Sequence, residues 1–169
     1  MSSPAGRIVI LRLMNALNAR LDLSRSPIKI PERFQRVSYN GKCYPGASGI
    51  RGLKDGANCQ RYAYEFVSAF GYKLPDFRSS DLWKDIAYTK LAKRPKLFDL
   101  VLVHKAPDPW GAHVGVYLGR GLVLHLSKKI GEPAIESLQS MMLRAQYRHL
   151  LGYKRILAVE RLNRRERQG

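Results

Sequence analysis

Cysteine is one of the residues that this sequence has little of. The chain of 169 residues has two cysteines, Cys43 and Cys59, so at most one disulfide can form and a disulfide-stapled scaffold is excluded. The two cysteines also lack the close spacing of a zinc knuckle, and we expect neither a metal site nor a cofactor. A chain of this length can bury a core without such links.

Acidic residues are scarce as well. Thirteen Asp and Glu face 30 Lys and Arg, which gives a formal net charge of +17. Such a field attracts anionic polymers, among them nucleic acid, anionic lipid and acidic cell-wall polymers. The basic clusters lie at 144–148, 154–155 and 161–167. A solvated basic face is the alternative, and no motif for reading bases accompanies the charge.

Long hydrophobic runs are absent too. Residues 8–23 have the weak pattern of an amphipathic helix, but Arg12, Asn15, Asn18 and Arg20 interrupt it, so we expect no transmembrane segment. A continuous apolar stretch with a small-residue cleavage site is not present either, which leaves a cytoplasmic location or export by a route other than Sec. The pattern does not predict an oligomeric state.

Local patterns predict one α+β domain over residues 1–169, with a core at about 35–160, an N-terminal extension at 1–34 and a basic tail at 161–169. Asn58 is a good N-cap for a helix that begins at Cys59 and ends near Gly71. The other expected elements are a helix from Ser79 or Ser80 to Pro95 with Leu82, Trp83, Ile86 and Leu91 buried, strands at 100–103, 114–118 and 122–126, a helix at 135–147 and a strand at 151–159.

Cys59 and two histidines form the candidate catalytic group. As the first residue of a helix, Cys59 lies where unpaired amide donors and the helix dipole favour a thiolate. A hairpin that turns at 119–121 places His113 and His125 as neighbours on one face of adjacent strands. His113 can therefore act as the base for the thiol, and His125 can orient it.

Several segments resemble the NlpC/P60 superfamily of papain-like cysteine peptidases and amidases. Residues 57–62, Ala-Asn-Cys-Gln-Arg-Tyr, look like the family's nucleophile helix. Residues 98–103 resemble its Gly-Asp-Leu-Val strand, residues 113–119 its His-Val-Gly-Ile-Tyr-Leu-Gly strand, and residues 123–125 the segment that supplies its third polar residue. The resemblance covers roughly residues 55–130.

The resemblance implies a papain-like α+β fold in which the nucleophile helix packs on an antiparallel β-sheet. It also implies a Cys-His-His triad of Cys59, His113 and His125, with the amide of Cys59 in the oxyanion site. The implied activity is hydrolysis of an amide bond, most often in a cell-wall (peptidoglycan) peptide. A non-catalytic basic protein of the same fold that binds an anionic polymer, and an effector or toxin acting as a protease or deamidase, are the alternatives.

Two departures from the family pattern bear on the substrate. Gln60 and Arg61 replace the usual Ser-Gly after the nucleophile, and Phe98 replaces the Gly before Asp99. Arg61 would add positive charge near an acidic substrate. Trp110, in the loop before His113, is the second candidate for substrate binding, because an aromatic side chain in a rim loop is suited to contact a ligand.

Overall fold

The computed structural model describes residues 21–157, and the predicted N-terminal helix and basic tail therefore lie largely or wholly outside the described residues. Two short 3-10 turns, η1 (Leu23–Arg25) and η2 (Glu32–Phe34), come first. The elements that follow are α2 (Cys59–Ser68), α3 (Ser79–Lys84), β1 (Thr89–Ala92), β2 (Leu100–His104), β3 (His113–Gly119), β4 (Leu122–Leu126), β5 (Pro133–Ser137), α4 (Leu138–Met142), η3 (Ala145–Tyr147) and β6 (His149–Ile156).

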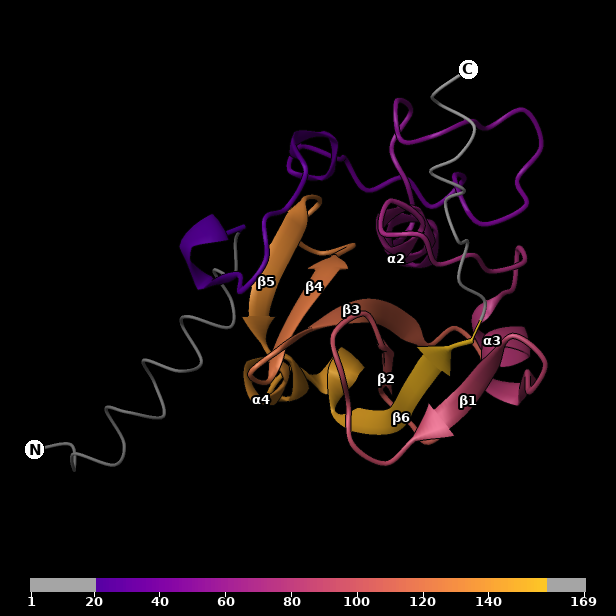
Figure 1. Ribbon diagram of the computed structural model, residues 1–169, viewed down its shortest axis with the longest axis vertical. Coiled ribbons are helices and arrows are strands. Elements are labelled where there is room, and N and C mark those ends of the chain that lie inside the picture. Colours follow the sequence, from indigo (N-terminus) through magenta and orange to yellow (C-terminus); the bar gives the residue numbers. More distant parts are fainter. Residues whose placement is uncertain (1–20, 158–169) are drawn as a thin grey trace, which may run out of the picture.

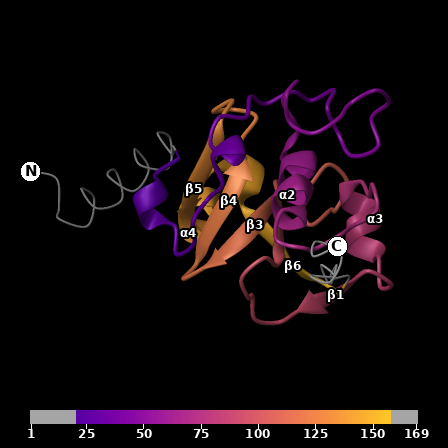
Figure 2. The same cartoon turned by 45° about the horizontal axis from the view of Figure 1, so that its top comes forward.

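The strands form one six-stranded sheet in the order β1-β6-β2-β3-β4-β5, and every pair of neighbours is antiparallel. Helix α2 lies beside β3, whereas α3 lies beside β1 at the opposite end of the sheet from β5 (Figures 1 and 2). The expected class, an α+β fold with the helix of Cys59 packed on an antiparallel sheet, is confirmed.

Alternation along the strands divides the core between the two faces of the sheet. Leu100 and Leu102 point to the main cluster with α2, whereas Val101 and Val103 point to a smaller cluster with Met141 and the half-buried Leu138 on the opposite face. The main cluster also takes in Ile30 and Phe34, which precede the expected start of the core. Both faces of the sheet centre are thus buried, which explains its continuous apolar strands.

The sequence predicted α2 and the central hairpin well. The Asn58 side chain accepts a hydrogen bond of 2.8 Å from the Arg61 backbone N–H, as an N-cap does. Strands β3 and β4 pair with Val116 opposite Leu124, and the turn between them uses positive φ angles at Gly119, Arg120 and Gly121. Those angles favour glycine, which is why the turn could be located from sequence.

The expected helix from Ser79 to Pro95 is wrong beyond Lys84. Ile86 is 88% exposed and Leu91 62% exposed, so neither belongs to a buried helix face. The carboxylate of Asp85 accepts from the backbone N–H groups of Ala87 and Tyr88 and turns the chain. Residues 89–92 then pair with β6 as an edge strand.

The expected helix at 135–147 is also wrong in its first part. Residues 133–137 form strand β5, which pairs with β4. Ala134 lies opposite His125, and Ile135 lies opposite Leu124. The helix begins only at Leu138, with Ser137 as the N-cap whose hydroxyl accepts from the Ser140 N–H. Pairing with β4 therefore outweighs the helical spacing of the apolar residues. No helix within residues 21–157 is long and apolar enough to cross a membrane.

Candidate active site

Cys59 lies at the start of α2, at the point where the helix meets β3. The backbone N–H groups of Cys59, Gln60 and Val114 are directed at its sulfur and favour the thiolate. Burial acts in the opposite direction and is the stronger cause, so the pKa of the Cys59 thiol is raised above its ordinary value. The helix terminus alone therefore does not lower the pKa of this thiol below its ordinary value.

His113 and His125 lie against each other, as the hairpin geometry predicted. His113 Nε2 and His125 Nδ1 are 2.8 Å apart, and their rings meet edge to face. Gly115 makes this close approach of β3 and β4 feasible, because a Cβ there would lie 2.6 Å from Val123 Cγ1 and 3.3 Å from His125 Cβ. His125 is fully buried, whereas His113 retains 9% exposure.

Glu136 on β5 extends this pair into a chain of hydrogen bonds. His125 Nε2 lies 2.6 Å from Glu136 Oε1, and the Arg144 guanidinium donates to both carboxylate oxygens, at 3.0 Å for Nη1 to Oε2. These contacts outweigh the effect of burial, so the pKa of Glu136 is lowered and the group is a carboxylate. Glu136 was not among the predicted site residues, because the helical spacing of the apolar residues placed residue 136 in a helix.

The Glu136 carboxylate, at the end of this chain of hydrogen bonds, determines which ring nitrogens of His113 and His125 carry protons. Ionised Glu136 can only accept, so His125 donates through Nε2 and its Nδ1 accepts from His113 Nε2–H. The Nδ1 atom of neutral His113 is thereby left with its lone pair free. A base is ready for a proton on the side of the ring that is not occupied by His125.

Burial also keeps His113 neutral. Its pKa is lowered well below the ordinary value, first by burial and then by the positive charges that His125 and Arg144 can carry. The Tyr147 ring packs over the imidazole with centroids 4.5 Å apart and an interplanar angle of 32°. A ring held on one face by Tyr147 and at Nε2 by His125 has little freedom to rotate.

Cys59 and His113 line one hollow with a volume of about 540 Å³. A volume in this range can hold a peptide segment or a small ligand. Its wall is built from the loop before α2, the ends of β2 and β3, the β4–β5 turn and η3. The lining residues are Tyr39, Cys59, His104, Lys105, Gly111, His113, Lys128, Lys129, Gln146 and Tyr147.

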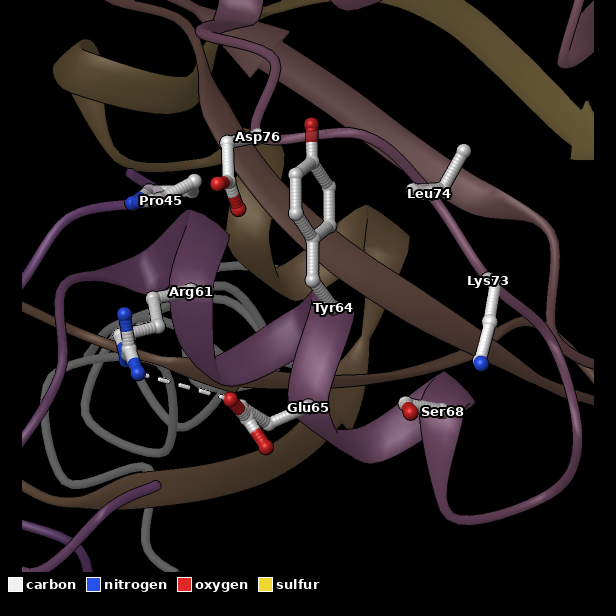
Figure 3. A pocket seen from close by; sticks show the side chains of 8 residues that line it. All are labelled: Pro45, Arg61, Tyr64, Glu65, Ser68, Lys73, Leu74 and Asp76. Atoms are coloured by element: carbon white, nitrogen blue, oxygen red, sulfur yellow. Dashed lines mark ion pairs between the residues drawn. The ribbon is translucent and has the colours of Figure 1, made fainter. Parts of the chain in front are cut away.

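Arg61, one of the two expected substrate-binding residues, does not line the hollow of Cys59. Its guanidinium donates to the carbonyl oxygens of Gly52 and Ile50 at 3.1 and 3.3 Å, and it lies 3.6 Å from Glu65. Figure 3 shows Arg61 and Glu65 turned toward each other in a second hollow along α2. Arg61 thus holds the loop at 50–52 against the helix.

Trp110, the other expected contact residue, is 74% exposed on the loop between β2 and β3. Its backbone N–H donates to Asp108 Oδ1 at 2.9 Å, which forms a tight turn. The next residue, Gly111, borders the hollow. Trp110 therefore stands next to the entrance without lining the hollow.

Several basic residues of the predicted cationic surface form contacts within the domain. Arg144 binds Glu136, Arg155 binds Asp99 through two hydrogen bonds of 3.0 and 2.7 Å, and buried Lys154 donates to the backbone after α3. Their charges therefore serve the fold, and fewer of the basic groups at 144–155 are left for a polymer.

Three solved structures are among those similar to this chain. They are the NlpC/p60 domain of peptidoglycan hydrolase SagA (17% identity, TM-score 0.41, 68% of this chain and 86% of that chain) and the P60 domain of an antigen from M. avium subspecies paratuberculosis (16%, 0.43, 91% and 98%). The third is the peptidoglycan hydrolase RipB from Mycobacterium tuberculosis (18%, 0.46, 95% and 74%). No protein-family model and no curated protein matches the sequence. Similarities of this size do not assign a function, which rests on the site's own residues.

Proposed function

We propose that this protein is a cysteine hydrolase that cleaves an amide bond, with Cys59 as nucleophile, His113 as base and His125 as the residue that orients the base. The observation that carries the proposal is the hydrogen-bonded chain from His113 through His125 to Glu136, at 2.8 and 2.6 Å. It leaves a neutral imidazole with a free Nδ1 at the hollow that Cys59 also lines. A structural histidine pair would need no such opening.

The reaction would begin with attack of the Cys59 sulfur on the carbonyl carbon of the substrate amide. Because the pKa of the thiol is raised, its proton would pass to His113 Nδ1 as the C–S bond forms. The oxygen of the tetrahedral intermediate would accept from the Cys59 N–H, the oxyanion donor that the resemblance implies. His113 then returns the proton to the leaving amine, and the C–N bond breaks.

Water would complete the cycle. His113, neutral again, takes a proton from a water that attacks the thioester carbonyl, and Cys59 leaves as thiol with that proton. Glu136 stabilises each transient imidazolium through His125, since the chain of hydrogen bonds connects the added positive charge to a carboxylate. Burial of the chain strengthens this effect.

The substrate class follows from the family that the segments around Cys59 and His113 resemble, which hydrolyses cell-wall peptides. The test is incubation of the protein with purified peptidoglycan and with its soluble peptides, with release of new amino groups as the measurement. Cys59→Ala and His113→Ala should each abolish release while circular dichroism stays unchanged. Release that persists in Cys59→Ala would contradict the proposal.

A further inference from the structure

The hollow at Cys59 has a rim of three lysines from two separate segments. Lys105 directly follows β2, and Lys128 and Lys129 lie in the turn between β4 and β5. All three are exposed, and no Asp or Glu lines the hollow with them. Positive charge is thus concentrated at the entrance of the hollow that Cys59 lines.

The backbone beneath these lysines is held in place. The Arg148 guanidinium donates to the Lys105 carbonyl oxygen at 2.9 Å. The β4–β5 turn closes with a 2.8 Å hydrogen bond from the Gly131 N–H to the Ser127 carbonyl oxygen, and the Gly131 carbonyl oxygen accepts from the Tyr39 N–H at 2.8 Å. The lysine side chains therefore extend from backbone segments that hydrogen bonds hold in place beside the hollow.

These lysines differ from three basic residues whose charges serve the fold. Arg144 and Arg155 are paired with carboxylates, and Lys154 is buried against backbone carbonyls. Among residues 21–157, none of Lys105, Lys128 and Lys129 has an acidic partner. Their charge is available to a ligand, and the residues that line the hollow include no Asp or Glu that would repel an anion.

We propose that Lys105, Lys128 and Lys129 select substrates that carry a carboxylate close to the scissile amide. Lysine ammonium groups attract a carboxylate from solution and hold it through exposed ion pairs. Three such groups around one hollow would favour an acidic peptide over its amidated form. The inference depends on the proposed function only for the bond that is cleaved, because the rim would select anions whether or not hydrolysis follows.

The test compares alkylation of Cys59 by iodoacetate and by iodoacetamide, which differ in one carboxylate. In both reactions the thiolate sulfur bonds to the CH₂ carbon and iodide leaves, so the pKa of Cys59 cancels in the ratio of the two rates. The variant Lys105→Gln/Lys128→Gln/Lys129→Gln should lower the iodoacetate-to-iodoacetamide ratio about tenfold, since one exposed charge pair contributes up to about fivefold. Replacement of the same lysines by arginine should preserve the ratio.

The matched control removes the same charge elsewhere. Lys84, Lys90 and Lys93 are exposed and do not line the hollow. Their joint replacement by glutamine should leave the ratio within about twofold, because distant exposed charges are screened by salt. An unchanged ratio in the rim variant, or an equal fall in the control, would overturn the proposal.

Binding to Cys59→Ala provides a second measurement that does not need a reactive sulfur. A short glutamate-containing peptide should bind at least about fivefold more tightly than its glutamine counterpart in calorimetry at low salt, and the rim variant should remove the difference. Equal affinities would also overturn the proposal. If the selectivity holds while peptidoglycan is not cleaved, the proposed function fails and the proposal for the lysine rim stands. If peptidoglycan is cleaved without selectivity for the acidic peptide, the proposed function stands and the proposal for the lysine rim fails.

Discussion

The two halves of the sheet differ in how their buried charged groups are paired. In the half made of β1, β6 and β2, Asp99 pairs with Arg155 and accepts from the Lys96 N–H, whereas Lys154 donates to the carbonyl oxygens of Trp83 and Asp85 at 3.1 and 2.6 Å. These polar groups are paired within the domain, and they line neither of the two hollows described above. Their contacts hold the edge strand and α3 in place.

In the half made of β3, β4 and β5, the buried groups form a chain with one open end. Arg144 and Glu136 close one end, and His113 at the other end borders the hollow of Cys59. A buried polar network is costly unless every member is satisfied. The Nδ1 atom of His113, which can accept a proton at the hollow, is therefore the feature that distinguishes a site from a structural network.

Isosteric substitutions of the two buried carboxylates should give the largest difference between the halves. Glu136→Gln removes the charge that fixes the histidine tautomers, and kcat/KM should fall by about 10² or more. It also leaves Arg144 without its carboxylate, at a cost of about 3 kcal/mol in the free energy of unfolding. Asp99→Asn should lower stability by about 1 kcal/mol and leave kcat/KM unchanged, since Arg155 is partly exposed.

A double variant separates activity from stability in this experiment. Glu136→Gln/Arg144→Met removes both buried charges, so denaturant unfolding should show most of the lost stability restored. Activity should stay low, because no carboxylate orients His125. Recovery of kcat/KM in the double variant would mean that Glu136 acts through stability alone.

How far the sequence could predict this site depends on whether the contacts are local. Asn58 before an apolar helix located Cys59, and a glycine turn between two alternating strands placed His113 beside His125. Both signals lie within about a dozen residues, where turn type sets register.

Glu136 could not be found in this way. Ala134, Ile135 and Glu136 are all buried, so β5 lacks the polar alternation that marks a strand. Its strand character comes from pairing with β4, a tertiary contact. Ser137, as a potential N-cap before Leu138, was the one local sign that the helix begins after residue 136.

The pH dependence of kcat/KM and of stability should come mainly from the half of the sheet made of β3, β4 and β5. The pKa of His113 is lowered below 6.5, so the base stays neutral as pH falls through 6.5, and kcat/KM should decline only at lower pH. Unfolded His113 takes up a proton below 6.5 while the folded group does not, so stability falls with acid in that window. The lowered pKa of Glu136 adds a further loss as pH drops below 4.5.

Steady-state rates and thermal midpoints measured from pH 3 to 8, roughly the range over which His and carboxyl groups titrate, check both parts. Asp99→Asn should keep the acid limb of kcat/KM where the parent protein has it. An acid limb centred at or above the ordinary histidine pKa would contradict the burial and contacts described for His113.

Lys154 tests the half of the sheet made of β1, β6 and β2, and the expected effect is smaller. Lys154 is 1% exposed, and burial lowers its pKa. Its ammonium donates to the carbonyl oxygens of Trp83 in α3 and of Asp85 directly after α3. Lys154→Met keeps the length of the side chain but leaves those carbonyls without a donor, which should cost about 2 kcal/mol in urea unfolding. Peptide hydrolysis should be unchanged, and a loss of activity beyond the loss of folded protein would show that the two halves are coupled.

Phe98, at the junction between the halves, should show the smallest effect, and it distinguishes backbone strain from packing. Its φ is 72°, in the left-handed region that favours glycine, while its ring packs against Phe66, Phe70 and Tyr72. Phe98→Ala loses the ring and keeps the strain, whereas Phe98→Gly loses the ring and relieves about 1 kcal/mol of strain. The glycine variant should therefore unfold at higher urea than the alanine variant, although its side chain is smaller. The opposite order would mean that the backbone at residue 98 relaxes when the ring is removed, and that the aromatic cluster alone imposes the positive φ.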